Sequence, residues 1–118
     1  MSKICIINTR PPYGSTAAKD ALDTALVSAS YDQDTSLLFL GDGIYQLMKG
    51  QQPEALPQKN PGAMFQALEM YGIENVLLCL EDMLDRGLQE SDLTIPVQLL
   101  ARKEIGGWLG QQDRVFNF

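Results

Sequence analysis

Cys79 is the residue whose type and position point most directly to chemistry. It stands at the end of an apolar run, just before a segment with helical character. The start of a helix stabilises a thiolate, which is the nucleophilic form of cysteine. Glu81 and Asp82 follow at once, however, and two nearby carboxylates oppose a further negative charge. Because cysteines in apolar surroundings are most often structural, the sequence favours a buried thiol, with Cys79 as the one candidate sulfur carrier.

The remaining side chains lack the commonest general base and metal ligand. The chain has 0 histidines, which removes the common general base near neutral pH and the commonest metal ligand. Serine-hydrolase and zinc-site interpretations are therefore disfavoured. Cys5 lies in the middle of an apolar run and is predicted to be structural. Two cysteines do not make a disulfide framework, and we expect free thiols in a reducing cytosol.

Two loops that follow apolar runs are candidates for ligand binding. Residues 8–16 hold two adjacent prolines, which lack the N–H groups that would cradle a phosphate, so a rigid connection is favoured there. The dinucleotide fingerprint and the P-loop pattern are both missing from the sequence. Asp42, between two glycines, is either a ribose or metal ligand or, as we favour, a helix N-cap. No catalytic residue, metal ligand or cofactor is assigned.

Short apolar runs predict the strands of a buried sheet. Such runs are typical of strands covered on both faces, as in parallel sheets. Pro96 weakens the fourth of them, because proline cannot donate to a sheet ladder. The predicted strands are Lys3–Asn8, Ser36–Leu40, Val76–Leu80, Thr94–Leu100 and Arg114–Phe118.

Helical segments alternate with these strands. The first is predicted from a cap at Ser15 or Thr16 to about Ser30, with small residues towards the sheet. The others are Ile44–Lys49 before Gly50, Asn60–Gly72 after a polar loop over 51–59, a helix to about Arg86 that stops at Gly87, and Ala101–Leu109, interrupted by Gly106 and Gly107. This alternation predicts an α/β fold: one domain over residues 1–118, with about five mostly parallel strands, helices on both faces and a flavodoxin-like architecture.

Functional groups in such sheets gather beyond the carboxyl ends of the strands. The predicted ends are Asn8–Gly14, Gly41–Gly43 and Cys79–Asp82. The candidate residues Asp42 and Cys79 therefore belong to the same edge of the predicted sheet.

Composition limits the partners. The net charge is −6 and no Lys/Arg cluster occurs, so direct nucleic-acid binding is not expected. No apolar run is long enough to span a membrane, and the start of the chain lacks the pattern of a signal peptide. We expect a cytoplasmic protein.

An ordered set of motifs resembles a known family. The segment Leu38–Gln51 is similar to a strand-DGVYQL-GQ segment of that family. Pro12-Tyr13-Gly14, the small-residue helix after it, Arg86-Gly87-Leu88 and a final aromatic residue support the match. On these residues the chain resembles, from end to end, the TusC/DsrF family within the wider DsrE/DsrF-like group, which implies a DsrE/DsrF-like domain.

The resemblance also implies a function. Three homologous small subunits of this kind assemble as a dimer of heterotrimers, here with TusB-like and TusD-like partners. The complex takes persulfide sulfur from an upstream carrier and passes it to a downstream carrier, towards 2-thiolation of the tRNA wobble uridine. The sulfur-bearing cysteine belongs to the TusD/DsrE-type subunit, where small neutral residues follow it. Cys79 stands at the same distance before Gly87, but Leu80, Glu81 and Asp82 follow it. We therefore expect a structural subunit that carries no sulfur and is not catalytic alone.

Other interpretations stay open at this stage. The chain is alternatively a Cys79-dependent sulfurtransferase subunit, the equivalent subunit of a dissimilatory sulfur-oxidation complex, or a flavodoxin-like nucleotide or flavin binder. The segment Ile44–Met48 is apolar at several positions and is expected to bury surface against a sister subunit.

Overall fold

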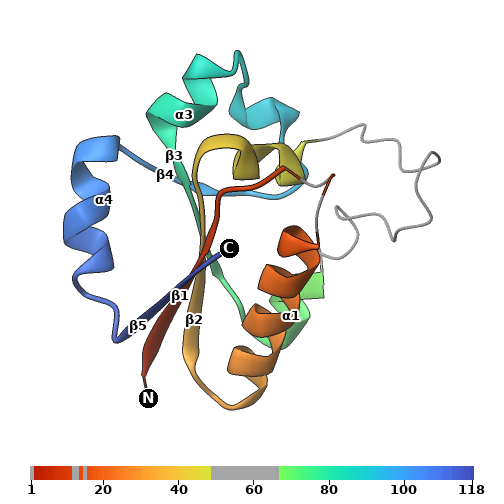
Figure 1. The fold of residues 1–118 in the computed structure, drawn as a ribbon, viewed down its shortest axis with the longest axis vertical. Coiled ribbons are helices and arrows are strands. Elements are labelled where there is room, and N and C mark those ends of the chain that lie inside the picture. Colours follow the sequence, from red (N-terminus) through yellow and green to blue (C-terminus); the bar gives the residue numbers. More distant parts are fainter. Residues whose placement is uncertain (1, 12–13, 15, 49–66) are drawn as a thin grey trace.

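Five parallel strands form one sheet in the computed structural model of the chain (Figure 1). The structure describes residues 2–11, 14, 16–48 and 67–118. In spatial order the strands run β4-β3-β2-β1-β5. Their bounds are β1 Lys3–Asn8, β2 Asp34–Phe39, β3 Asn75–Cys79, β4 Gln98–Leu100 and β5 Arg114–Asn117. The predicted α/β fold with five parallel strands is confirmed.

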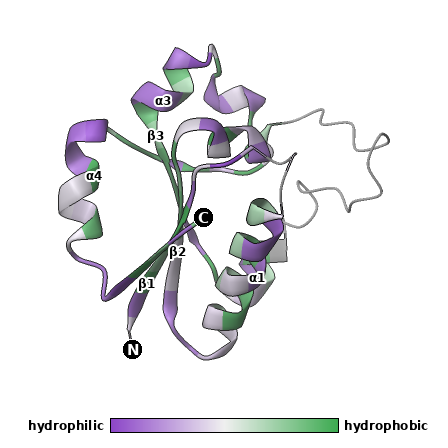
Figure 2. Ribbon diagram, in the orientation of Figure 1, coloured by the Kyte–Doolittle hydropathy of each residue, from purple (hydrophilic) through white to green (hydrophobic). Residues whose placement is uncertain are grey.

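The three central strands are buried on both faces; β1 and β3 are almost wholly apolar, whereas β2 also buries Thr35 and Ser36. Every residue of β1 after Lys3 and of β3 after Asn75 is buried, and so is every residue of β2 after Asp34. Figure 2 shows hydrophobic residues along β1 and β3. The outer strands β4 and β5 are shorter and more exposed, as expected at the edges of a sheet.

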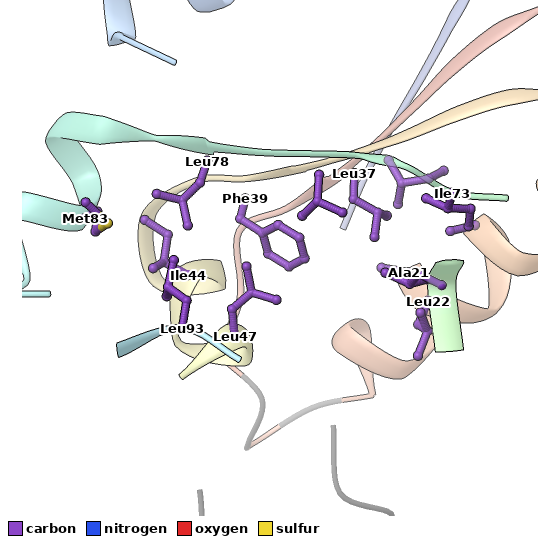
Figure 3. Packing of buried hydrophobic residues seen from close by; sticks show 14 of the residues in the cluster. Ala21, Leu22, Leu37, Phe39, Ile44, Leu47, Ile73, Leu78, Met83 and Leu93 are labelled. Atoms are coloured by element: carbon purple, nitrogen blue, oxygen red, sulfur yellow. The ribbon is translucent and has the colours of Figure 1, made fainter. Parts of the chain in front are cut away.

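Helices cover both faces of the sheet, as predicted. On one face Ala21, Leu22 and Ala25 of α1 pack in a large core with Leu37 and Phe39 (Figure 3). On the other face α4 packs through Ile105 in a smaller core that includes Cys5 and Cys79. The helices are α1 Ala17–Ser30, η1 Gly41–Leu47, η3 Ala67–Tyr71, α3 Leu80–Asp85, η4 Glu90–Asp92 and α4 Arg102–Leu109, where η marks a 3-10 helix.

The ends of β2 and β3 lie one or two residues from the predicted ones, and three further features differ from the predictions for physical reasons. The fourth strand begins at Gln98 rather than Thr94, because Pro96 cannot join the ladder. The helix α4 is regular although it contains Gly106, since Ile105 buries against the sheet and packing outweighs propensity. Thr16 stands at the N-cap of α1, but its hydroxyl donates to the Asp20 carboxylate at 3.0 Å and caps no backbone N–H.

Several predicted features lie outside the described residues. They are Pro12 and Tyr13, the cap candidate Ser15, the stop at Gly50, the polar loop over 51–59, the helix start at Asn60-Pro61 and Met64. The described end of that helix, η3, stops as predicted at Gly72, whose φ of 79° favours glycine.

The expectation of an apolar interface surface over Ile44–Met48 is wrong for Ile44 and Leu47, whereas Tyr45 and Met48 are half-buried. Ile44 and Leu47 are both 0 % exposed, and they pack in the core of their own chain beside Phe39 and Leu93 (Figure 3). Ile44 and Leu47 of η1 therefore close the end of the large core. They are not available to a sister subunit.

Among the described residues, no helix combines the length and the apolar character needed to cross a membrane.

Candidate functional site

The loops that follow β1, β2 and β3 meet at the carboxyl edge of the sheet, as predicted. The backbone N–H of Leu40 donates to the carbonyl oxygen of Asn8 at 3.0 Å, which joins the first two loops. The side-chain amide of Gln46 donates to the carbonyl oxygen of Arg10 at 2.8 Å. The N–H of Gly41 donates to the Asp82 carboxylate at 2.8 Å, which joins the second loop to the third.

Gly43 marks the closest approach between two of these loops. A Cβ atom at this position would overlap the carbonyl group of Asn8. Only a residue without a side chain therefore lets η1 cross the end of β1. The third position of the Gly41-Asp42-Gly43 segment must be glycine, because any side chain there would clash with the Asn8 carbonyl.

Cys79 lies where the sequence predicted, at the last position of β3 and directly before α3. Its side chain is 1 % exposed and belongs to the smaller core, together with Leu38, Leu77 and Leu100. The Sγ atom lies 3.9 Å from Oε1 of Glu81, in the geometry of a weak hydrogen bond from the thiol. In this position the neutral S–H group of Cys79 donates a hydrogen bond to the Glu81 carboxylate.

Glu81 has a role that the sequence did not reveal. Its Oε1 atom accepts the backbone N–H of Arg102 at 2.8 Å, so the carboxylate satisfies a free N–H at the start of α4. That hydrogen bond is the main reason why the pKa of Glu81 is lowered. The side chain ties α3 to α4 and borders Cys79 at the same time.

Asp82 is a second residue of α3 whose carboxylate binds neighbouring elements. Partial burial raises its pKa, but the Gly41 N–H and the Arg102 guanidinium outweigh this effect, and the pKa of Asp82 is lowered. Arg102 donates from Nη2 to Oδ1 of Asp82 at 2.7 Å. Both carboxylates of the first turn of α3 therefore hold neighbouring elements in place.

Arg102 is the residue of this site that sequence reasoning missed. The hydrogen bond to Asp82 is the main reason why the pKa of Arg102 is raised, and Cys79 makes a smaller contribution in the same direction. A positive charge therefore lies near the sulfur atom, although no basic residue is near Cys79 in the sequence. The only signal was the Arg102-Lys103 pair just after the fourth predicted strand.

Asp42 does not have the predicted capping role. Leu40 is the N-cap of η1, and no side chain caps that helix. The Oδ1 atom of Asp42 instead accepts hydrogen bonds from Nε and Nη2 of Arg86, at 3.2 and 3.0 Å. Arg86 also donates to the carbonyl oxygen of Asp82 at 3.0 Å, so it joins the second loop to the end of α3.

Cys5 lies in the middle of β1 and is 0 % exposed. Burial raises the pKa of its thiol to about 12, so it stays neutral near pH 7. Among the described residues, no group of three or more His, Cys, Asp and Glu side chains is arranged to hold a metal ion.

The side chains of this site mainly form hydrogen bonds and ion pairs that hold neighbouring elements together. Two arginines and three acidic side chains join η1, α3 and α4 beside a buried thiol. Within the part of the chain that the structure describes, Glu81 is the group that accepts the thiol hydrogen bond, and the same oxygen also accepts the Arg102 N–H at the start of α4. The arrangement can position loops and bind a partner surface.

Comparison with known proteins gives a consistent result. A model of the DsrE/DsrF-like family matches residues 2–118. A protein of Vibrio parahaemolyticus named "Protein TusC homolog" is 33 % identical over 118 residues, which are the whole of both chains. A protein of the same name from Pseudomonas aeruginosa is 35 % identical over 112 residues, or 95 % of this chain and 94 % of that one.

A solved structure has the same fold. The YchN protein of E. coli superposes with a TM-score of 0.85 at 26 % sequence identity, over 100 % of both chains. The parallel sheet and its helices are therefore shared along the full length.

Proposed function

Since this chain belongs to the DsrE/DsrF-like family of sulfur-relay subunits, and within it to the TusC/DsrF group, we propose that it is the subunit that carries no sulfur. Its complex would pass persulfide sulfur towards 2-thiolation of the tRNA wobble uridine. The observation that carries the proposal is the environment of Cys79. The one cysteine at a strand end is 1 % exposed and donates to a carboxylate.

Sulfur transfer between proteins requires a thiolate that a persulfide can reach. The thiolate is the nucleophile, and a buried structural cysteine is inert. Glu81 sits next to Cys79 and keeps its negative charge, because a backbone N–H of Arg102 lowers its pKa. An incoming persulfide would have to reach a sulfur atom that is buried and lies beside this carboxylate.

The loops at the carboxyl edge of the sheet are held by hydrogen bonds and ion pairs, which supports a structural role for this subunit. Neighbours can raise the reactivity of a partner's cysteine by fixing its loop and excluding water, without touching sulfur themselves. The carboxyl-edge loops of this chain are held by side chains from Asp42, Asp82 and Arg86. In the proposed complex these loops frame the cysteine of the TusD-like subunit.

The proposed assembly is a cytoplasmic dimer of heterotrimers with TusB-like and TusD-like subunits. The chain itself makes no contact with tRNA, because its net charge of −6 offers no phosphate-binding surface. Upstream and downstream sulfur carriers reach it only through the complex. It has no catalytic activity of its own and holds no cofactor.

The test is a deletion strain in which the TusD-like carrier is confirmed at its normal level. Nucleoside chromatography with mass detection on bulk tRNA should show that 2-thiouridine is lost from wobble positions. Adding back the Cys79→Ser form should restore it as fully as the native chain does. Unchanged 2-thiouridine in the deletion strain would contradict tRNA thiolation and favour the equivalent role in dissimilatory sulfur oxidation.

A second function is favoured by the position of Arg102. Arg102 and the Cys79 thiol both contact Oε1 of Glu81, and a nearby cation stabilises a thiolate. If Cys79 is a sulfur carrier, Cys79→Ser should fail to restore 2-thiouridine, and a persulfide should be found on Cys79 after sulfur loading. The add-back arm of the same experiment therefore separates the two functions.

A further inference from the structure

The two edges of the sheet are built differently. β4 is a strand of three residues, and Pro96 stands two positions before it. Short strands and nearby prolines are ordinary ways to prevent an edge from pairing with another chain. β5, at the opposite edge (Figure 1), is one residue longer, and no proline stands in or beside it. All four of its residues, Arg-Val-Phe-Asn, are exposed.

The inner side of β5 is fully used by β1. The Phe118 N–H donates to the Ile7 carbonyl at 2.9 Å, and the Phe118 carbonyl accepts from the Thr9 N–H at 3.0 Å. In a parallel ladder alternate residues bond to the same neighbour, so Phe116 and Arg114 also turn their backbone groups to β1. The N–H and C=O groups of Val115 and Asn117 therefore point away from the sheet.

We infer that β5 is a homotypic docking edge, on which β5 of a second copy of this chain adds antiparallel to give one continuous sheet. An antiparallel pair centred on Phe116 places Val115 opposite Asn117 of the second copy, and the reverse. Both pairs are then hydrogen-bonded pairs, so all the outward backbone groups of the strand find partners. The contact is isologous, as a two-fold dimer requires.

The side chains are self-complementary in the same register. Phe116 faces its own copy across the two-fold axis, and Arg114 faces Phe118, on the side of the sheet where Ile4 and Ile6 also lie. Aromatic pairs and Arg–aromatic pairs are favourable cross-strand neighbours, and no like charges oppose each other. On the other side Val115 faces Asn117. Val115 and Phe116 are 44 % and 38 % exposed in the single chain, and pairing would cover them.

Cysteine cross-linking tests the register directly. In Phe116→Cys the two thiols meet in a non-hydrogen-bonded pair, where Cα atoms are about 4.5 Å apart, a spacing that a disulfide accepts. Oxidation should therefore give a covalent dimer. The matched control is Val115→Cys, which is more exposed but faces Asn117, and should cross-link only at background rate. The native cysteines do not interfere, since Cys5 and Cys79 are buried.

A second variant tests the backbone contact. Val115→Pro removes the outward N–H and leaves the ladder to β1 intact, so the chain should stay folded by circular dichroism. Light scattering on the native full-length chain should show a dimer at high concentration, and Val115→Pro should be monomeric. Equal cross-linking of the Phe116 and Val115 variants, or a native chain that stays monomeric at its highest soluble concentration, would overturn the inference. Cross-linking of Phe116→Cys to a sister subunit in place of its own copy would overturn it too. None of these outcomes depends on the sulfur-relay role.

Discussion

The carboxylate of Glu81 accepts the backbone N–H of Arg102 at 2.8 Å, although 21 positions separate the two residues in the chain. The same oxygen atom lies 3.9 Å from the sulfur of Cys79. One side chain therefore fixes the start of α4 and sets the charge beside the thiol. The expected stability and reactivity of this site both follow from that relationship.

The first prediction concerns acid stability. The lowered pKa of Glu81 means that the folded state favours the charged carboxylate. Its contribution to stability is present above the unfolded pKa, about 4.3 for Glu, and is lost as the pH falls through the folded pKa. Glu81→Gln should therefore destabilise the protein near pH 7, and the difference should shrink towards acid.

Urea unfolding at a series of pH values measures this effect. Glu104→Gln, on the exposed side of α4, is the matched control and should leave the pH dependence as it is in the native chain. Parallel stability curves for the native chain and Glu81→Gln would show that the Glu81–Arg102 contact carries no pH-dependent stability.

The second prediction uses two glycines with opposite surroundings. Gly43→Ala should destabilise strongly, because the new Cβ would overlap the Asn8 carbonyl, and overpacking costs about 1–3 kcal/mol or more. Gly106→Ala should stabilise by about 0.5–1 kcal/mol, since it lies in α4 with nothing within 4 Å of the new Cβ. Thermal and urea unfolding of both variants test the contrast. Two changes of the same sign would contradict the close approach at Gly43.

The fold was predictable mainly because β1 and β3 are nearly pure apolar runs and β2 ends in one. Burial on both faces leaves no alternation in β1 and β3, and this pattern together with the intervening helices indicates a parallel sheet. The strand ends followed from the same pattern, so the positions of Asp42 and Cys79 at one edge were predictable too. The bounds of β4 were not, because an edge strand of three residues has little pattern to read.

The partners of the site residues were not predictable in the same way. From the sequence, Glu81 and Asp82 were interpreted as charges that oppose a thiolate, and Glu81 does lie beside the sulfur of Cys79. Their main contacts, however, are with Arg102 and Gly41, which are brought close only by the strand order β4-β3-β2. Contacts between elements that are distant in the chain leave no periodic pattern in the local sequence, so they could not be predicted from it. Asp42 was misassigned for the same reason, since its true partner Arg86 lies 44 positions away.

The third prediction separates the two ends of an ion pair. Asp42→Ala should cost little, less than about 1 kcal/mol, because the Asp42 side chain is 57 % exposed and surface pairs contribute weakly. Arg86→Ala should cost more, about 1–2 kcal/mol, since Arg86 is less exposed and also donates to the Asp82 carbonyl. Unfolding free energies of the two single variants provide the comparison. Equal losses would mean that the hydrogen bond to Asp82 adds nothing.

The last prediction concerns the thiols. In the folded chain both cysteines should react slowly with a thiol reagent, because Cys5 is 0 % and Cys79 is 1 % exposed, and both should react at once in urea.

When the complete complex is loaded with sulfur, mass spectrometry should find the persulfide on the TusD-like subunit and none on Cys79. Cys79→Ser should keep sulfur transfer and lose about 1–3 kcal/mol of stability, because it places a hydroxyl in an apolar core. Cys79→Ala is the control that removes the thiol without adding a polar group, and it should transfer sulfur equally well. Rapid labelling of Cys79 in the folded chain, together with loss of transfer in both variants, would reverse the assignment and make Arg102 the cation that stabilises a reactive thiolate.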